Sequence, residues 1–173
     1  EYKTFIELYT NGEPYVETVD FSQESFEYYK IDSQFIPEMY KSRRTCDSIK
    51  DLIFDLDFKT EMFDVFFRNQ DERSECYERL KRDFDEIEIT TSMTNNLEIM
   101  LKGINKGSAL RELCQIAGFD IKDVTVVGDS KNDLTVFNTE ATKYAVANAC
   151  EEIKALADKI ICSNDENIMC YIE

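Results

Sequence analysis

The stretch that decides the fold is Val-Val-Gly-Asp-Ser-Lys-Asn-Asp, residues 126–133. Its two valines, with Val124 before them, indicate a short buried strand of a parallel sheet, and Gly128 allows the chain to turn sharply where that strand ends. In open α/β sheets, ligands bind at the carboxyl ends of the strands. The stretch therefore predicts an α/β fold with a ligand site at the tip of this strand.

Three polar side chains in this stretch are typical of a site for Mg²⁺ and phosphate. Asp129 at the strand tip is a hard oxygen ligand of the kind that Mg²⁺ prefers, while Asn132 and Asp133 open the next helix within reach of the same point. The same residues also fit an ordinary loop and helix cap. Because short motifs often occur by chance, the stretch by itself favours neither interpretation.

The flanking segments match a known family. Upstream lies Asn105-Lys106-Gly107, and downstream lie residues 144–149 and Ser163-Asn164. Taken in order, these segments resemble the C-terminal half of a Cof-type phosphatase (class IIB, C2 cap) of the haloacid dehalogenase superfamily. In that family an Asn-Lys-Gly lysine precedes the Gly-Asp-x-x-Asn-Asp segment by a helix and a strand. The 23 positions from Lys106 to Asp129 leave room for both.

This resemblance implies a mechanism and a role for each site residue. An aspartate carboxylate attacks phosphorus and forms an aspartyl-phosphate, which water then hydrolyses. Asp129 would be a ligand of Mg²⁺, and Lys106 would donate to the phosphoryl oxygens and stabilise the nucleophile. Asn132 would hydrogen-bond the substrate phosphate, while Asp133 would hold Lys106 or a metal-bound water in place. The substrate would be a sugar phosphate or another small phosphorylated metabolite.

Residues 1–101 have the pattern of an α+β module with an antiparallel sheet. Residues 2–10 and 13–19 alternate around Asn11-Gly12, which predicts a β-hairpin. The pattern then predicts helical character over 22–44, a strand over 50–57, helices over 59–69 and 71–84, and a second strand pair over 87–91 and 97–101. The resemblance assigns this module to the family's cap.

Residues 102–173 alternate between helices and strands, as one half of a doubly wound parallel sheet does. The first helix, 108–117, has apolar residues at helical spacing and ends before Gly118, a good residue for a helix terminus. Strands are expected over 124–127, 144–147 and 159–162, with helices over 134–137 and 151–157 between them. The resemblance assigns this part to the C-terminal portion of the family's Rossmann-like core.

The family's nucleophile belongs to an Asp-x-Asp-Gly-Thr segment that precedes the cap. Here Asp55-Leu56-Asp57 is the one similar stretch, but Phe58 and Lys59 stand where the family has glycine and threonine. A strand of the cap explains this stretch better than a nucleophile does. We therefore expect a Cof phosphatase without its N-terminal core segment, inactive alone. A non-catalytic binding or regulatory protein and a phosphomutase of the same superfamily are the alternatives.

Composition excludes several classes of protein and mechanism. A net charge of −16, from 36 acidic and 20 basic residues, argues against binding to nucleic acid or to anionic membranes. The six cysteines form no Cys-x-x-Cys pair and the chain has no histidine, which argues against zinc and excludes Ser-His-Asp and Cys-His catalysis. No stretch is long and apolar enough to span a bilayer. These features predict a cytoplasmic protein in a reducing compartment.

Three further expectations concern assembly and lesser residues. Without the nucleophile's strand beside it, the strand at 124–127 would be an exposed edge, so we expect self-association, a swapped element or a retained N-terminal fragment to cover it. Asn148 and the segment 163–165 read as helix caps. Four aromatic residues between 28 and 40 fit the core better than a substrate pocket; they are Tyr28, Tyr29, Phe35 and Tyr40.

Overall fold

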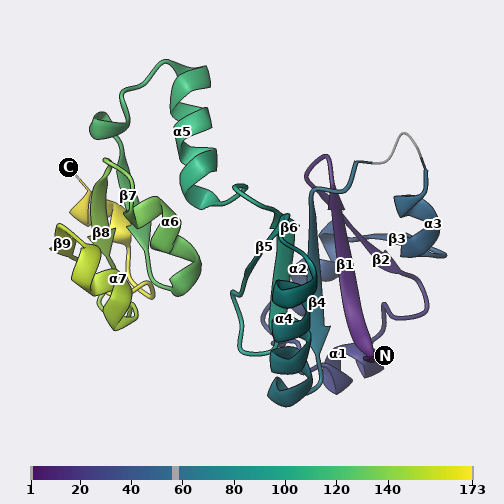
Figure 1. The fold of residues 1–173 in the computed structure, drawn as a ribbon. Coiled ribbons are helices and arrows are strands. Elements are labelled where there is room, and N and C mark those ends of the chain that lie inside the picture. Colours follow the sequence, from purple (N-terminus) through teal and green to yellow (C-terminus); the bar gives the residue numbers. More distant parts are fainter. Residues whose placement is uncertain (1, 56–58, 173) are drawn as a thin grey trace. The chain divides into compact units, whose positions relative to one another are not determined.

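The computed structural model describes residues 2–55 and 59–172 of the 173-residue chain. The chain divides into two compact units, Glu1–Lys102 and Gly103–Glu173, and each unit has its own sheet and its own apolar core. Figure 1 shows the elements of both units. Among the residues described, no helix is both long enough and apolar enough to cross a membrane.

Unit 1 is built on a sheet of six described strands in the order β3-β2-β1-β4-β6-β5. The strands are β1 (Thr4–Thr10), β2 (Glu13–Glu17), β3 (Arg44–Cys46), β4 (Met62–Phe67), β5 (Ile87–Thr90) and β6 (Asn96–Leu101). Neighbouring strands are antiparallel except β2 and β3, which run parallel. The predicted antiparallel sheet is thus confirmed, with one parallel pair at its edge.

The predicted hairpin between β1 and β2 is confirmed. Asn11 and Gly12 form its turn with φ angles of 51° and 74°, a left-handed pair that asparagine and glycine tolerate best. The turn sets the register in which Thr10 faces Glu13.

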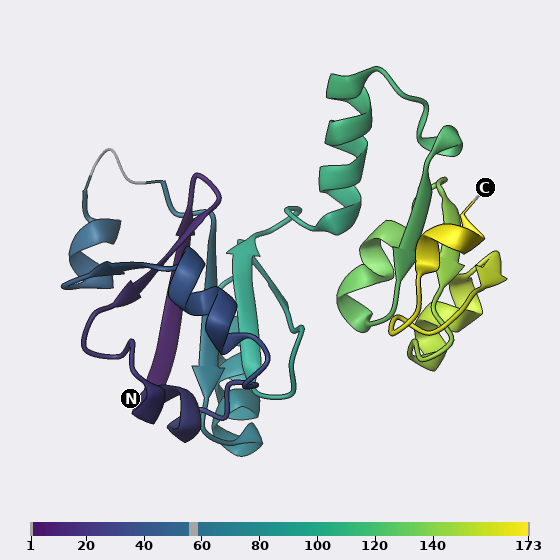
Figure 2. The same ribbon diagram turned by 180° about the vertical axis from the view of Figure 1, so that it is seen from behind.

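Helices lie on both faces of this sheet. They are α1 (Gln23–Tyr28), α2 (Ile36–Ser42), α3 (Ile49–Ile53) and α4 (Gln70–Asp83). Figure 1 and the reverse view in Figure 2 show α2 and α4 on opposite faces. On the α1 and α2 face, the ring of Phe5 packs edge-on against Phe26 and Phe66, at centroid distances of 5.8 and 5.9 Å. This aromatic cluster forms the core of the unit.

Two predicted elements of unit 1 are wrong. The expected strand over 50–57 begins instead as α3, because Ser48 caps the helix at Asp51 N–H and Ile49 is buried. Its last residues, Leu56 and Asp57, lie outside the described part of the chain. The expected helix over 59–69 is strand β4, paired on both sides by β1 and β6. Its apolar run is too short for periodicity to distinguish a helix from a strand. Hydrogen bonding to β1 on one side and β6 on the other stabilises the strand.

Unit 2 is a parallel α/β unit, which confirms the predicted fold class. Its described strands, in the order β7-β8-β9, are β7 (Thr125–Gly128), β8 (Thr142–Ala145) and β9 (Lys159–Ile160). Its helices are α5 (Lys106–Ala117), α6 (Leu134–Phe137) and α7 (Glu151–Leu156), with 3-10 turns η1 (Ile121–Asp123), η2 (Lys131–Asp133) and η3 (Ile168–Tyr171). Figures 1 and 2 show α7 and η3 on opposite sides of the strands.

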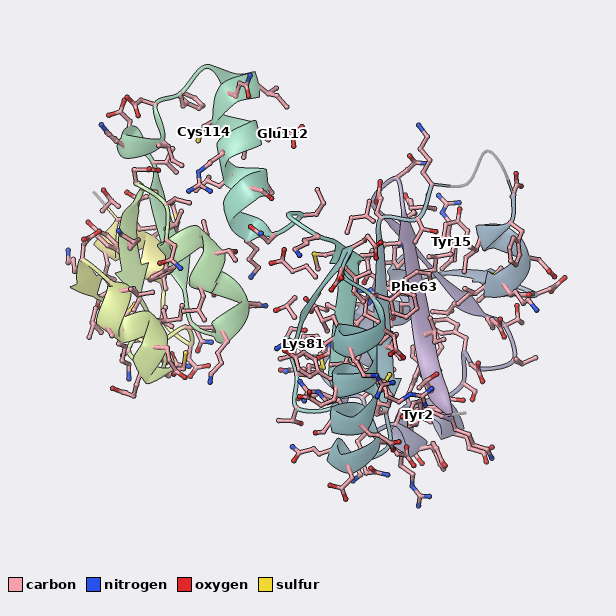
Figure 3. All side chains as sticks on the ribbon, in the orientation of Figure 1. Tyr2, Tyr15, Phe63, Lys81, Glu112 and Cys114 are labelled. Carbon is pink, nitrogen blue, oxygen red and sulfur yellow. The ribbon has the colours of Figure 1, made fainter. Side chains whose placement is uncertain are left out.

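Helix α5 begins two residues before the predicted start at 108 and ends before Gly118, as predicted. Asn105 caps the N-terminus by accepting from Ser108 N–H, and Gly118 ends the helix in the left-handed conformation, with φ of 74°. Cys114 packs against the unit on one side of α5, and Glu112 lies on the other side (Figure 3). Two apolar side chains of the same helix, Leu113 and Ile116, are 61% and 78% exposed.

Candidate functional site

The turn after β7 is fixed by a close approach at Gly128. A Cβ atom there would lie 2.6 Å from Cε2 of Phe137 and 2.8 Å from Oδ2 of Asp133, so only glycine fits. Because Gly128 allows this contact, residues 129–133 fold back over the carboxyl end of the strand. The turn therefore lies at the carboxyl end of β7, where the sequence predicts a ligand site.

Asp133 organises this turn. Its side chain is buried, and its Oδ2 atom accepts hydrogen bonds from the backbone N–H groups of Asp129, at 3.0 Å, and Ser130, at 3.4 Å. Its Oδ1 atom accepts from Nζ of Lys106 at 2.5 Å. A buried carboxylate is stable only when charge and hydrogen bonds compensate it, and these three donors supply both.

Lys106 joins α5 to the turn after β7. It is the first residue of the helix, and its side chain remains 54% exposed although it is paired with Asp133. An ammonium group has three N–H donors, so one bond to Asp133 leaves donors for a ligand from solvent. Lys106 is therefore an accessible positive charge on a very acidic molecule.

Asp129 and Asn132 complete the group. The carboxylate of Asp129 is exposed, and within the described residues no hydrogen bond or ion pair engages it. The carbonyl group of Asp129 accepts from Cys150 N–H at 2.8 Å, which holds its backbone in place. The side-chain oxygen of Asn132 accepts from Oγ of Ser130 at 2.7 Å, so its amide N–H groups are left to donate to an anion.

Asp129 fits one position in the coordination shell of Mg²⁺. No three or more histidine, cysteine, aspartate or glutamate side chains of the described residues gather in a way that could enclose a metal ion. Mg²⁺, however, usually binds one or two carboxylates and completes its shell with water and substrate phosphate. The single exposed carboxylate of Asp129 is consistent with that habit.

The structure brings together the four residues singled out from the sequence. Lys106 meets Asp133, Asp133 meets the backbone of Asp129, and Asn132 lies in the same short turn. Asp55 belongs to unit 1, where it follows α3, and Asp57 lies outside the described residues.

The two predicted caps near the site are wrong. The residue before α7 is Cys150, which makes no side-chain cap bond, and η3 is capped by Asn167. Asn148 instead accepts from Asn164 N–H, at 3.1 Å, and donates to its side chain, at 2.8 Å. The loops after β8 and β9 leave the same end of a parallel sheet, which brings Asn148 of one loop next to Asn164 of the other.

A buried polar network in unit 1 was missed by sequence reasoning. Glu7 is fully buried and binds Arg43 through two hydrogen bonds, 2.8 and 2.9 Å long. Asp64 is paired across the sheet with Glu7 and accepts from Nδ2 of Asn96 at 2.9 Å. Burial raises the pKa of Asp64 to about 8, although the Asn96 hydrogen bond opposes this rise. The available signal was the position of Glu7 and Asp64 inside otherwise apolar strands.

The aromatic residues of unit 1 divide between core and surface. Tyr29 is buried against Phe5, as predicted. Tyr40 is 51% exposed, although its ring contacts Phe26. Phe35 does not belong to the core: it lines a cleft of about 620 Å³ whose other walls come from Lys30, Asp32, Gln34 and residues 92–95.

Comparison with known proteins agrees with the fold. A family model described as haloacid dehalogenase-like hydrolase matches residues 1–170. The 5-amino-6-(5-phospho-D-ribitylamino)uracil phosphatase YcsE of Bacillus subtilis is 35% identical over 105 residues, which are 61% of this chain and 41% of the relative. The phosphatase YwtE of the same organism, described by the same activity, is 33% identical over 106 residues, 61% of this chain and 37% of the relative. This chain thus aligns with about two fifths of the length of these curated relatives.

Solved structures share the fold at lower identity. A haloacid dehalogenase-like hydrolase from B. subtilis superposes with a TM-score of 0.74 at 19% identity, covering 98% of this chain and 66% of that one. The subclass IIB sugar phosphatase BT4131 superposes with a TM-score of 0.70 at 17% identity, covering 94% of this chain and 56% of that one.

Proposed function

This chain belongs to the haloacid dehalogenase-like hydrolases, and we propose that it is the cap and the C-terminal core portion of a Cof-type, Mg²⁺-dependent phosphatase. Unit 1 is the cap and unit 2 is the core portion. The observation that carries the proposal is the contact of Lys106 with Asp133, because it joins two motifs 27 residues apart into one anion site at the tip of β7. A solvated lysine or a simple helix cap would not require that contact.

Each residue of the site has a separate task. Lys106 donates to the phosphoryl oxygens and balances the charge that accumulates there as the phosphate ester is cleaved. Asp133 holds Lys106 and the backbone of the turn, so it orients the lysine without contacting substrate. Asn132 donates to a phosphate oxygen through its amide N–H groups.

Asp129 would hold Mg²⁺, which supplies positive charge between a carboxylate and a phosphate that otherwise repel each other. The attacking carboxylate of such an enzyme forms an aspartyl-phosphate that water then hydrolyses. The described carboxylates of the site are Asp129, which would hold the metal, and Asp133, which is buried and already bonded to Lys106 and to the turn, so neither is free to make that attack. We therefore propose that the 173-residue chain alone binds phosphate but does not hydrolyse phosphate esters.

The substrate class is a small phosphorylated metabolite. Relatives are described as phosphatases of a ribitylaminouracil phosphate and of phosphoglycolate, which have in common a phosphate monoester on a small polar carbon skeleton. We place the protein in the cytoplasm, a proposal that its six free cysteines support.

Binding of inorganic phosphate tests this proposal without any need for turnover. We expect NMR titration of the chain with phosphate, with and without Mg²⁺, to move the amide signals of residues 129–133, and Lys106→Met to abolish the shifts. Asp129→Asn should remove the effect of Mg²⁺ and leave weak phosphate binding. Lys122→Met, which removes an exposed lysine of the same unit, is the matched control. Phosphate-induced shifts that persist in Lys106→Met would refute the role of Lys106 in binding phosphate.

A further inference from the structure

The first turn of α5 is held from outside the helix at two successive residues. The side chain of Lys106 reaches Asp133, and the backbone N–H of Gly107 donates to Oγ1 of Thr135 at 3.2 Å. Helix N-termini leave their first N–H groups without partners inside the helix. Asn105 satisfies the N–H of Ser108, whereas the N–H of Gly107 is satisfied by a residue of another helix.

The same pair of residues is also in close contact through the backbone. A Cβ atom on Gly107 would lie 2.3 Å from the carbonyl oxygen of Thr135 and 2.7 Å from its carbonyl carbon. These are backbone atoms, which cannot rotate away as a flexible side chain can. The glycine of the Asn-Lys-Gly motif therefore allows α5 to lie directly on the first turn of α6.

We propose that Thr135 is a positioning residue for Lys106. Asp133 and Thr135 are two residues apart on one short segment, and they hold Lys106 and Gly107, which are adjacent on α5. The Thr135 hydroxyl holds the backbone next to Lys106, and the Asp133 carboxylate holds the ammonium group at the end of the Lys106 side chain. The proposal rests on the role that the proposed function gives to Lys106.

A lysine needs such support more than most side chains. Its four-carbon stem is flexible, so one ion pair at its tip does not by itself place the ammonium group. Functional groups are held in position by neighbours that are themselves fixed by packing and hydrogen bonds. Thr135 meets that description, because its hydroxyl bonds to Gly107 and its backbone touches the same residue.

The test measures how accessible the Lys106 amine is to limited acetylation of the full chain. The acetylation rate of Lys106 is divided by that of exposed Lys122 in the same molecules, by mass spectrometry. Thr135→Val keeps the branched shape and removes the hydrogen-bond acceptor, and we expect it to raise this ratio roughly two- to tenfold, as for one lost hydrogen bond. Thr135→Ser should keep the wild-type ratio. Asp133→Asn removes the ion pair with the Lys106 ammonium group and should give the highest acetylation ratio of the series.

Two further variants separate positioning from general loosening of the unit. Thr139→Val removes a buried hydroxyl that bonds to Val136 rather than to α5, and it should leave the ratio unchanged. Gly107→Ala should raise the ratio with Thr135 intact, because the added methyl group pushes α5 away. If Thr135→Val fails to fold, the serine and Gly107→Ala variants decide.

An unchanged ratio in Thr135→Val, or an equal rise in Thr135→Ser, would overturn the proposal. So would an unchanged ratio in Asp133→Asn, since Lys106 would then not be held in solution. The assay contains no phosphate, metal or substrate, so its outcome is independent of the phosphate titration that tests the proposed function.

Discussion

At the scale of single residues, Asp64 should make the stability of unit 1 depend on pH. Its folded pKa of about 8 lies above the value of about 4 for an unfolded chain. The folded state therefore binds this proton more tightly, so the contribution is fully present below pH 4 and is lost as pH rises toward 8. Between pH 4 and pH 8, the free energy of unfolding should therefore fall by roughly 2–5 kcal/mol through Asp64 alone.

Urea unfolding of wild type and Asp64→Asn at pH 5 and pH 9 measures this contribution. The variant keeps the shape of the side chain without the charge, so it should be more stable than wild type at pH 9 and depend less on pH. Asp85→Asn, at an exposed position of the same unit, should leave the pH dependence as it is. Parallel pH profiles for wild type and Asp64→Asn would contradict the assigned role of Asp64.

Arg43 is the partner that makes a buried Glu7 possible. Arg43→Met would remove the charge and the two hydrogen bonds that Arg43 gives to the fully buried Glu7, leaving only the hydrogen bond from the Tyr9 hydroxyl, and we expect a loss of roughly 3–5 kcal/mol in unfolding free energy. The double variant with Glu7→Gln should recover much of this loss, because no unpaired charge then remains. Denaturant unfolding of the two single variants and the double variant gives the coupling energy, and additive losses would show that the pair is not coupled.

At the scale of elements, the junction of β7 and α6 depends on the absence of a side chain at position 128. Gly128→Ala would place a methyl group against Phe137 and Asp133, and we expect a loss of roughly 1–3 kcal/mol from overpacking. Adding Phe137→Leu should relieve part of the strain. Thermal unfolding of both variants tests this, and a double variant less stable than the sum of the single changes would argue against the contact.

The elements that the sequence predicts correctly are those with their own local signals. The β1–β2 turn has Asn11-Gly12, and the C-terminus of α5 has Gly118. Strand β4 has no such signal, because its apolar run is short and its pairing partners lie far away in the sequence. The Lys106–Asp133 contact was expected from a family pattern, whereas the Thr135 contact depends on a fit between two backbones that no spacing reveals.

At the scale of the whole molecule, we expect the chain alone to lack phosphatase activity. Turnover of p-nitrophenyl phosphate with Mg²⁺ should be no greater than that of a Lys106→Met control, because the described carboxylates of the site, Asp129 and Asp133, already have the roles of metal ligand and partner of Lys106. Activity that Asp55→Asn abolishes would instead make Asp55 the nucleophile. An Asp-x-Asp-Gly-Thr segment encoded upstream of residue 1 would favour a longer enzyme over a non-catalytic binding protein.

The exposed surface of unit 2 should also determine how the chain assembles. In the described residues β7 pairs with β8 alone, so its other edge presents unpaired backbone groups. Helix α5 and the residue after Gly118 add exposed apolar side chains in the same unit, with Leu113 at 61%, Ile116 at 78% and Phe119 at 67%. Repulsion from a net charge of −16 is screened beyond about 8 Å at physiological salt, so it does not offset these contacts.

We therefore propose that the chain covers this surface by self-association, by a swapped element or by a retained N-terminal fragment. Sedimentation velocity at micromolar concentration should show a species heavier than the 20.2 kDa monomer, or mass spectrometry should show a second polypeptide. Ile116→Glu should weaken association by placing a charge on the apolar face of α5. Asn138→Asp adds the same charge at another exposed position of unit 2 and should not. A folded monomer with no second polypeptide would mean that unit 2 is stable with its edge strand open to water.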